Sequence, residues 1–420
     1  MTRGKLPLGI QNFEELRKGG YLYADKTDMV WQIANGDKYN FLSRPRRFGK
    51  SLLVSTLQCY FEGKKELFEG LKIMELEKDW IKRPVIHFSM NLGGSDAESL
   101  YHYLDDTLTK YEEIYGKRAT EATLSNRFTG IIERAYQQSG EQVAVLVDEY
   151  DAPLQHSYLT DRHEKCRNLY RDFFTGLKDY GYCIKCVFLT GITKFTQISL
   201  FSVLNTLSNI SFYNCYATIC GLTKEEILEN LKDEIQVLAV QKKWDIDQTM
   251  HELKDMYDGY HFSESLQGVY NPFSVICALK ERRLRPYWIA SGATEMLPKI
   301  LTNFEKDVET LDGSLIDMDY IETADISKDN PKLFLYQLGY LTIKGVIGET
   351  YRLGFPNREV KKALLELVVP NMLNANKEET EIASRHYADA YAASKKKLIS
   401  LALVFDKENR GLIDWQEADK

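Results

Sequence analysis

The segment Tyr39-Asn40-Phe41-Leu42-Ser43-Arg44-Pro45-Arg46-Arg47-Phe48-Gly49-Lys50-Ser51 decides the fold class of this chain. Its first residues, 39–42, have the character of a short buried strand. After Ser51, mostly apolar side chains recur at the spacing of a helix, at Leu52, Leu53, Thr56, Leu57 and Tyr60. A strand, a tight loop and a helix in this order predict a loop that holds phosphate groups.

The tripeptide Gly49-Lys50-Ser51 supplies the groups that such a loop needs. Glycine lets the backbone approach the phosphates, lysine reaches the β and γ oxygens, and a hydroxyl binds Mg²⁺. The helix N-terminus adds free amide donors and a favourable dipole. We therefore expect ATP and Mg²⁺ as cofactors, with the cofactor-binding residues Arg44, Arg46, Arg47, Phe48, Gly49, Lys50, Ser51 and Leu52.

The loop departs from the usual pattern G-x-x-x-x-G-K-[ST], because Arg44 occupies the first glycine position. Pro45 stiffens the loop, and Arg46 and Arg47 add charge, so we expect a cradle that uses cations as well as amides. The alternative is a chance Gly-Lys-Ser on a surface turn. The flanking strand and helix favour the phosphate site, since they are the context that confirms the motif.

A second signal lies where the apolar run 143–147 ends in Asp148 and Glu149. Open α/β sheets bind ligands at the carboxyl ends of their strands. We expect Asp148 and Ser51 to bind the metal, Glu149 to orient or polarise the attacking water, and Lys50 to contribute to catalysis. The alternative is a strand end with solvated acids.

Two threonines follow the apolar strand pattern 184–189. A polar side chain at this place can contact the γ-phosphate or the water. Thr190 is therefore a candidate catalytic residue, with Thr193 as a second candidate. A plain turn explains the two threonines nearly as well.

Short apolar segments alternate with helical patterns over residues 1–220, which we expect to form the first domain. The expected strands are 39–42, 85–90, 143–147 and 184–189, with a fifth near 215–218. Helical patterns cover 97–139 and 163–180. The alternation predicts an α/β fold: a P-loop NTPase sheet, mostly parallel, with helices on both faces.

The pattern becomes mainly helical from Gly221. Thr223 and Glu226 have the spacing of a capping box at a helix start. Residues 333–353 indicate a helix followed by a hairpin. We expect a helical lid and a winged-helix-like module over 221–370, followed by a short C-terminal part, 371–420.

The composition of the 420 residues, with 44% hydrophobic and 27% charged, is typical of a globular protein of two or three domains. No apolar stretch is long enough to span a membrane, and residues 1–7 lack the apolar segment of a secretory signal. The seven cysteines are scattered, which argues against a disulfide scaffold. These features predict a cytoplasmic protein without membrane contact.

The net charge of −7 disfavours general nucleic-acid binding, although local basic patches leave it open. The basic residues of 280–285 and 395–397 are most simply solvated helix faces. Cys183 and Cys186 lie inside a strand pattern, which favours ordinary strand residues over a metal or redox pair. His87 and His261 have no metal-ligand spacing around them and are expected to be structural.

Several motifs in order resemble the bacterial AAA-ATPase-like family. Besides the arginine-rich loop and the acidic strand end, they are Leu6–Ile10, Tyr23–Thr27, Tyr257–Tyr260, Tyr270–Phe273, Leu338–Leu341 and Phe355–Asn357. The resemblance covers roughly residues 5–370. It implies a P-loop ATPase in which the arginine-rich loop is the customary form, so that Arg44 need not indicate an inactive site.

Members of that family are often joined to a C-terminal nuclease-like domain of the PD-(D/E)XK type. After Phe355 the chain has no strand that carries Glu-x-Lys, yet 387–391, 398–405 and 413–415 resemble the end of such a domain. The resemblance therefore implies a remnant that lacks its catalytic middle, and nuclease activity is not expected.

Together these features predict an ATP-binding and Mg²⁺-dependent ATP-hydrolysing protein. The alternative is a nucleotide-gated scaffold or regulatory switch with little turnover, which signals to a partner through the lid. A protein partner or self-association stays open, as does the identity of any arginine finger.

Overall fold

The computed structural model describes residues 4–194, 207–290, 311–324, 331–364, 401–405 and 412–417. The chain divides into two compact units, Met1–Leu365 and Glu366–Lys420. The first unit contains a five-stranded sheet in the order β2-β3-β4-β1-β5, and all of its strand pairs are parallel. Its strands are β1 Tyr39–Ser43, β2 Val85–Ser89, β3 Val143–Asp148, β4 Ile184–Gly191 and β5 Ser208–Asn209. The predicted α/β fold is confirmed.

The register of the sheet aligns the carboxyl ends of its strands. Ser43 lies opposite Gly191, and Ser89 lies opposite Asp148. Every residue of β3 is buried, which explains why its sequence is continuously apolar up to the terminal aspartate. Because parallel strands all end on the same edge, the loops that follow β1 to β4 gather there.

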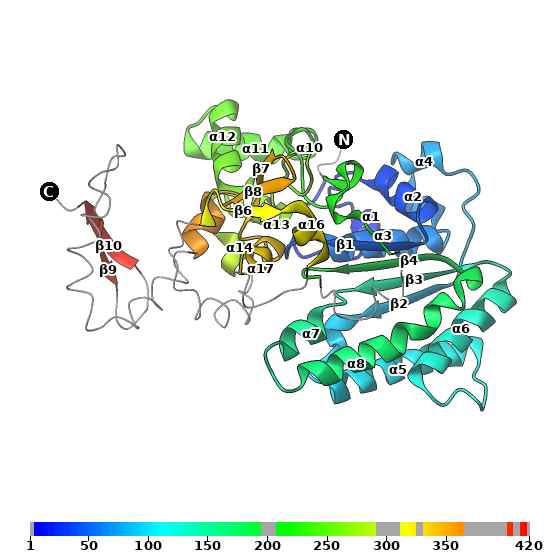
Figure 1. The fold of residues 1–420 in the computed structure, drawn as a ribbon. Coiled ribbons are helices and arrows are strands. Elements are labelled where there is room, and N and C mark those ends of the chain that lie inside the picture. Colours follow the sequence, from blue (N-terminus) through cyan, green and yellow to red (C-terminus); the bar gives the residue numbers. More distant parts are fainter. Residues whose placement is uncertain are drawn as a thin grey trace. The chain divides into compact units, whose positions relative to one another are not determined.

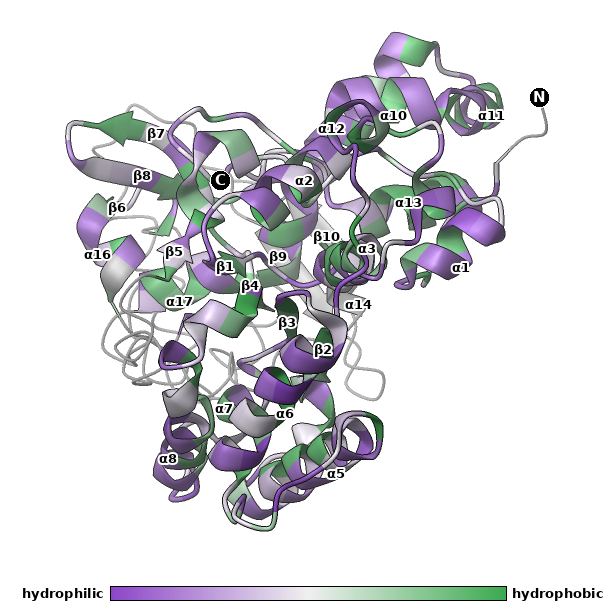
Figure 2. Cartoon of the chain, turned by 90° about the vertical axis from the view of Figure 1, so that its right-hand side faces the viewer, coloured by the Kyte–Doolittle hydropathy of each residue, from purple (hydrophilic) through white to green (hydrophobic). Residues whose placement is uncertain are grey.

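Helices lie on both faces of this sheet (Figure 1). One face carries α1 Phe13–Lys18, α2 Thr27–Asn35, α3 Lys50–Phe61 and α4 Ile73–Leu76. The other carries α5 Ala97–Tyr115, α6 Leu124–Ser139, α7 Ala152–Ser157 and α8 His163–Phe174. Figure 2 shows hydrophobic colour along the central strands and mixed colour along the helices, as expected for helices with one buried face.

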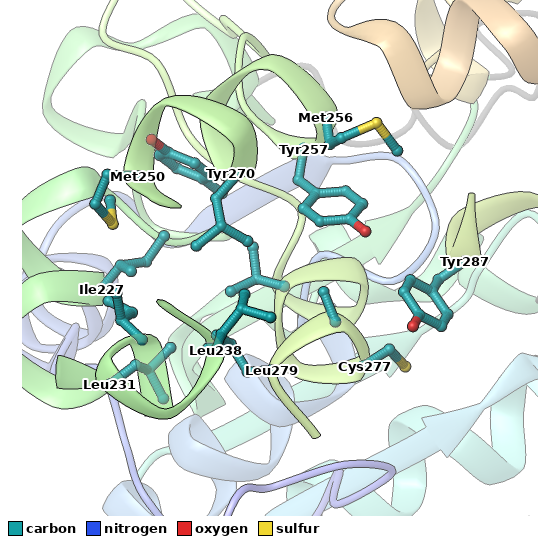
Figure 3. Close-up of a cluster of buried hydrophobic side chains, with 14 residues drawn as sticks. Ile227, Leu231, Leu238, Met250, Met256, Tyr257, Tyr270, Cys277, Leu279 and Tyr287 are labelled. Atoms are coloured by element: carbon teal, nitrogen blue, oxygen red, sulfur yellow. The ribbon is translucent and has the colours of Figure 1, made fainter. Parts of the chain in front are cut away.

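A helical region follows the sheet in the same compact unit. Its helices are α10 Lys224–Asn230, α11 Lys232–Lys242, α12 Ile246–Tyr257, α13 Pro272–Glu281 and α14 Tyr287–Ala290. The predicted capping box is present, because the Thr223 hydroxyl accepts from the Glu226 amide and the Glu226 carboxylate accepts from the Thr223 amide. Buried side chains of these helices form one apolar cluster (Figure 3). Leu6, Leu8 and Leu22 from the N-terminal segment pack against this cluster.

The predicted helix and hairpin of 333–353 are also present. They comprise α17 Pro331–Leu338, β7 Thr342–Ile347 and β8 Thr350–Gly354. A third strand, β6 Leu315–Asp317, pairs with β8 and leads into α16 Met318–Thr323. In the second unit, β9 Leu401–Phe405 and β10 Leu412–Glu417 form an antiparallel pair. The remainder of 371–420, including 387–391 and 395–397, lies outside the described residues.

Two predicted elements differ from the observed ones. The fifth strand lies at Ser208–Asn209, whereas Asn214–Tyr216 forms a 3₁₀ turn, in which the Tyr216 amide donates to the Tyr213 carbonyl. The helical patterns predicted over 97–139 are present as α5 and α6, which are separated after Gly116, whose φ is +87°. The helix expected over 163–180 changes to a 3₁₀ turn after Phe174. Each difference lies where local backbone bonding overrides apolar spacing.

One buried carboxyl group joins three elements of the helical region. Glu359 is fully buried, and its Oε1 accepts from the Ser274 hydroxyl at 3.1 Å and the Trp288 amide at 2.7 Å. Its Oε2 has no hydrogen-bond partner among the described residues. Burial raises the pKa of Glu359 to about 7, against the opposing effect of these donors.

We expect Glu359→Gln to abolish a pH dependence of stability. The folded pKa lies above the usual 4.5, so the folded state keeps a proton that the unfolded state releases as the pH rises from about 4.5 to 7. Stability is therefore lost over this window, by up to about 3 kcal/mol for Glu359. Glutamine resembles the protonated acid, and its advantage over wild type should grow with pH in urea unfolding at pH 5 to 8. Exposed Glu349→Gln is the control; equal slopes for all three proteins would contradict the prediction.

Candidate functional site

A polar cavity of about 490 Å³ lies at the carboxyl edge of the sheet. The loop after β1 contributes Gly49 to its lining, and the first residues of α3 contribute Lys50 and Ser51. The end of β3 contributes Asp148, and Glu149 follows directly. The structure thus brings together the two separate signals of the sequence. Arg46, Arg47 and Leu52 also line this cavity, in agreement with their predicted place.

The backbone at the start of α3 explains the glycine of the motif. Gly49 occupies the N-cap position with φ of +91°, a left-handed conformation that other residues adopt with strain. Lys50 is only 7% exposed, and its Nζ donates to the carbonyls of Arg44 and Pro45, each at 3.0 Å. Burial lowers the pKa of Lys50, while the nearby carboxylates of Asp151 and Asp148 oppose that shift.

The two acidic residues at the end of β3 have different surroundings. Asp148 is buried, and its Oδ1 has no hydrogen-bond partner in the part of the chain that the structure describes. A buried carboxylate oxygen with this vacancy, in the same cavity as the Ser51 hydroxyl, fits the oxygen chemistry of Mg²⁺. Burial raises the pKa of Glu149, and Asp148 raises it further, whereas Lys50 lowers it.

Asp151 fixes the turn that carries these acids. Its Oδ2 accepts from the backbone amides of Ile192 at 3.0 Å and Thr193 at 2.6 Å, from the Thr193 hydroxyl at 2.6 Å and from the Gln155 amide at 2.5 Å. These bonds tie the segment after β3 to the end of β4. Gly191 is required beside them, because a Cβ there would lie 2.3 Å from Asp151 Oδ1.

The surroundings of the Thr190 side chain do not support its predicted catalytic role. Its side chain is fully buried, and its hydroxyl donates to the Leu42 carbonyl at 2.9 Å, which joins β4 to β1. The Thr193 hydroxyl is engaged by Asp151. Neither threonine is among the residues that line the polar cavity. The polar strand end therefore holds the backbone, in line with the alternative of a structural turn.

The side chain of Arg44 also lies away from the cavity that it was expected to line. Its guanidinium is buried and donates to the carbonyls of Ser211 at 2.8 Å and Tyr216 at 2.9 Å, and it lies 4.3 Å from the Phe262 ring centre. At the first glycine position, Arg44 therefore connects the loop by hydrogen bonds to the segment after β5.

Phe48 is directed towards the helical region rather than the polar cavity. Its ring packs edge-on against Tyr260 at 4.8 Å and Phe262 at 5.5 Å between ring centres. Phe48 therefore packs the predicted phosphate loop against the helical region, and its backbone continues into Gly49. The indole of Trp288 holds the same loop, because its Nε1 donates to the Arg46 carbonyl at 3.3 Å.

A second pocket of about 130 Å³, mainly apolar, adjoins the first. The two cavities share Pro7, Gly49, Leu52, Pro272 and Ile276 in their linings. The walls of the apolar pocket come from the N-terminal segment, α3 and the helical region. Two charged residues, Lys26 and Glu226, also line it and form an ion pair at 2.5 Å.

Sequence reasoning missed the far wall of the polar cavity. The residues concerned are Ser89 at the end of β2, Asn91 after it, Gln155 and His156 in α7, Phe273 at the start of α13 and the segment 8–11. Ser89 lies near the end of the predicted strand 85–90 and Asn91 directly follows it, which was a usable signal because strand ends share one edge. For the remaining residues no local pattern marks the contact.

The other residues considered from the sequence have structural surroundings. Cys183 and Cys186 are buried, and burial raises the pKa of both thiols. The His261 ring contacts the Ile343 carbonyl at 2.8 Å, and burial lowers its pKa. In the basic run, Arg285 pairs with Glu281. Within the described ranges, no group of three or more histidine, cysteine or acidic side chains is arranged to hold a metal ion.

Comparison with known proteins connects this geometry to a family. A family model described as "Predicted AAA-ATPase" matches residues 7–201, which include both the phosphate loop and the acidic end of β3. The chain is also 35% identical over 377 residues to the "Uncharacterized protein in vnfD 5'region" of Azotobacter chroococcum mcd 1. That match covers 88% of this chain and 70% of the relative. This chain belongs to the AAA-ATPase-like family.

The family assignment supports nucleotide binding by this AAA-ATPase-like protein. The match ends at residue 201, so the helical region and the C-terminal unit lie beyond it. Among the described residues, no helix of the AAA-ATPase-like protein is long and apolar enough to cross a membrane.

We expect the arginines of this AAA-ATPase-like loop to separate into two roles. Arg44→Ala should lower the free energy of unfolding by about 2 kcal/mol, because two buried carbonyls lose their donors. Arg46→Ala should weaken ATP binding several-fold, since Arg46 lines the cavity. Urea unfolding and calorimetry with Mg·ATP measure the two effects. Weaker binding with unchanged stability for Arg44→Ala would instead place its charge at the phosphates.

Proposed function

We propose that this protein binds ATP with Mg²⁺ in the polar cavity and hydrolyses it. The observation that carries the proposal is the meeting of Lys50 and Ser51 with Asp148 and Glu149 in one cavity, where Asp148 presents a buried and unpartnered oxygen. The family match supports a nucleotide ligand. The phosphate chain would lie against the N-terminus of α3, where free backbone amides and the helix dipole favour negative charge.

Four residues of the cavity have distinct parts in the proposed reaction. Lys50 would exchange its bonds to the Arg44 and Pro45 carbonyls for phosphate oxygens and neutralise their charge. Ser51 and Asp148 would hold Mg²⁺, which supplies charge stabilisation to the transferred phosphoryl group when bound. Glu149 would accept a proton from the attacking water, and its raised pKa suits a general base. The water oxygen would bond to the γ-phosphorus as the bond from that phosphorus to the departing ADP oxygen breaks, and the proton of the water would pass to the Glu149 carboxylate.

A second candidate function, the nucleotide-gated switch, is favoured by the contacts behind the phosphate loop. Trp288 donates to the Arg46 carbonyl, and a Cβ on Gly339 would lie 2.6 Å from the Pro45 side chain. The helical region therefore contacts the loop that would hold the phosphates. A change of the loop on binding would reach α14 and α17 directly. We propose 221–370 as the region that transmits such a signal, with a protein partner or a second copy as its receiver.

Loss of the lysine should remove nucleotide binding. We expect Lys50→Ala to weaken Mg·ATP binding by at least about 100-fold, because a buried cation that meets the phosphates is replaced by a methyl group. Calorimetry measures the affinity, and Lys65→Ala is the matched control at an exposed lysine. Equal affinity of Lys50→Ala and wild type would show that the ligand is not bound through this loop.

Loss of the glutamate should separate binding from turnover. Glu149→Gln is expected to keep Mg·ATP binding and to reduce phosphate release by about 100-fold or more, since the amide cannot accept the proton. Exposed Glu66→Gln is the control. If wild type binds ATP and its slow release is insensitive to Glu149→Gln, the switch is the better description.

A further inference from the structure

The apolar pocket beside the phosphate cavity contains one buried ion pair. Lys26 precedes α2 and is 6% exposed, and its Nζ lies 2.5 Å from Glu226 Oε1. Apart from this ion pair, the Lys26 Nζ has no hydrogen-bond partner in the described chain. Burial lowers the pKa of Lys26, while Glu226 opposes the shift. An ammonium group thus retains unused donors at a mainly apolar site.

The Glu226 carboxylate is fixed by the start of α10. Its Oε2 accepts from the Thr223 amide at 2.9 Å as part of the capping box. A carboxylate accepts about four hydrogen bonds, so Glu226 keeps free acceptor capacity beside the free donors of Lys26. Asn230 lines the same pocket, but its amide nitrogen donates to the Glu226 carbonyl.

The surrounding walls favour an apolar group as the occupant. Leu22, Leu52, Leu53 and Ile276 line the pocket, and Gly49 and Leu52 are common to both cavities. A molecule with its phosphates at the start of α3 would reach the apolar pocket past these two residues. Burying an ion pair is costly unless it makes further hydrogen bonds. A heteroaromatic ring with a donor next to an acceptor on its edge would supply both of those bonds.

We propose that Lys26 and Glu226 read the edge of an adenine base. The 6-amino group of adenine donates to Glu226, and the ring nitrogen next to it, N1 or N7, accepts from Lys26. This inference rests on the proposed binding of ATP in the polar cavity and adds a specificity device to it. The ion pair also joins α2 to α10, so the base contacts the N-terminal segment and the helical region at the same time.

Adenine analogues test the two contacts one at a time. Affinities of wild type and Lys26→Met are measured by calorimetry for ATP, 1-deaza-ATP and 7-deaza-ATP, and those of Glu226→Gln for ATP and purine riboside triphosphate, which lacks the 6-amino group. We expect wild type to lose about ten-fold with one deaza analogue and with purine riboside triphosphate. Lys26→Met should bind ATP about ten-fold more weakly and show no further loss with that deaza analogue.

Glu226→Gln should bind ATP more weakly and lose less than wild type when the 6-amino group is absent, because a neutral acceptor replaces a charged one. Glutamine is compatible with the capping box, which limits the effect on folding. Lys224→Met and Glu225→Gln, at exposed positions in the same helix, are the matched controls. Thermal unfolding of all variants shows whether a loss of affinity follows from a loss of stability.

Magnesium tripolyphosphate separates this inference from the proposed function. It should bind wild type and Lys26→Met equally and fail to bind Lys50→Ala. Unchanged affinity for both deaza analogues in wild type, with tripolyphosphate still bound through Lys50, would overturn the reading of the base and leave the phosphate site intact. Equal tripolyphosphate binding by wild type and Lys50→Ala would overturn the phosphate site itself.

Discussion

The carboxylate of Asp151 holds together the two strand ends on which the candidate site is built. One oxygen accepts hydrogen bonds from the Ile192 and Thr193 amides, the Thr193 hydroxyl and the Gln155 side chain. Such a set of donors fixes the backbone between Asp148 and this anchor. Glu149 lies within that short span with φ of +50°, a conformation uncommon for residues other than glycine. The strain is tolerated because the flanking bonds determine the turn.

A second constraint acts on the phosphate loop from the opposite side. Phe48 packs on Tyr260, Arg44 donates to carbonyls after β5, and Trp288 holds the Arg46 carbonyl. The loop is therefore fastened at its start, middle and end by segments distant in sequence. This arrangement explains an arginine-rich loop better than charge alone, because one arginine is structural while Arg46 and Arg47 line the cavity.

Sequence patterns predicted the parts of the fold that depend on local periodicity. Four strands, the helix after Gly49 and the capping box at Thr223 agree with the structure, since burial and capping leave short-range signals. The meeting of Lys50 with Asp148 could be inferred because parallel strands end on one edge. The direction of the Arg44 side chain could not be inferred, because its two acceptors lie 167 and 172 residues further along the chain.

The same limit explains the unexpected contributors to the pockets. Nothing in the sequence around Pro7 or Lys26 shows that these residues face the start of α3 or that Lys26 meets Glu226. Their roles follow from the way the N-terminal segment crosses to the helical region. Polar residues such as Thr190 misled for a related reason: a hydroxyl at a strand end suits both a ligand and a neighbouring backbone carbonyl, and only the register of β4 with β1 decides between them.

The N-terminal segment has a consequence for how the chain can be divided. Leu6, Leu8 and Leu22 complete the apolar cluster of the helical region, although they belong to the opposite end of the sequence. A fragment that stops at residue 220 would leave these leucines and the outer face of Phe48 in water. The boundary predicted there marks a change in secondary structure inside the compact unit Met1–Leu365. Evolutionary exchange of the helical region for another would have to bring along matching changes in the first two dozen residues.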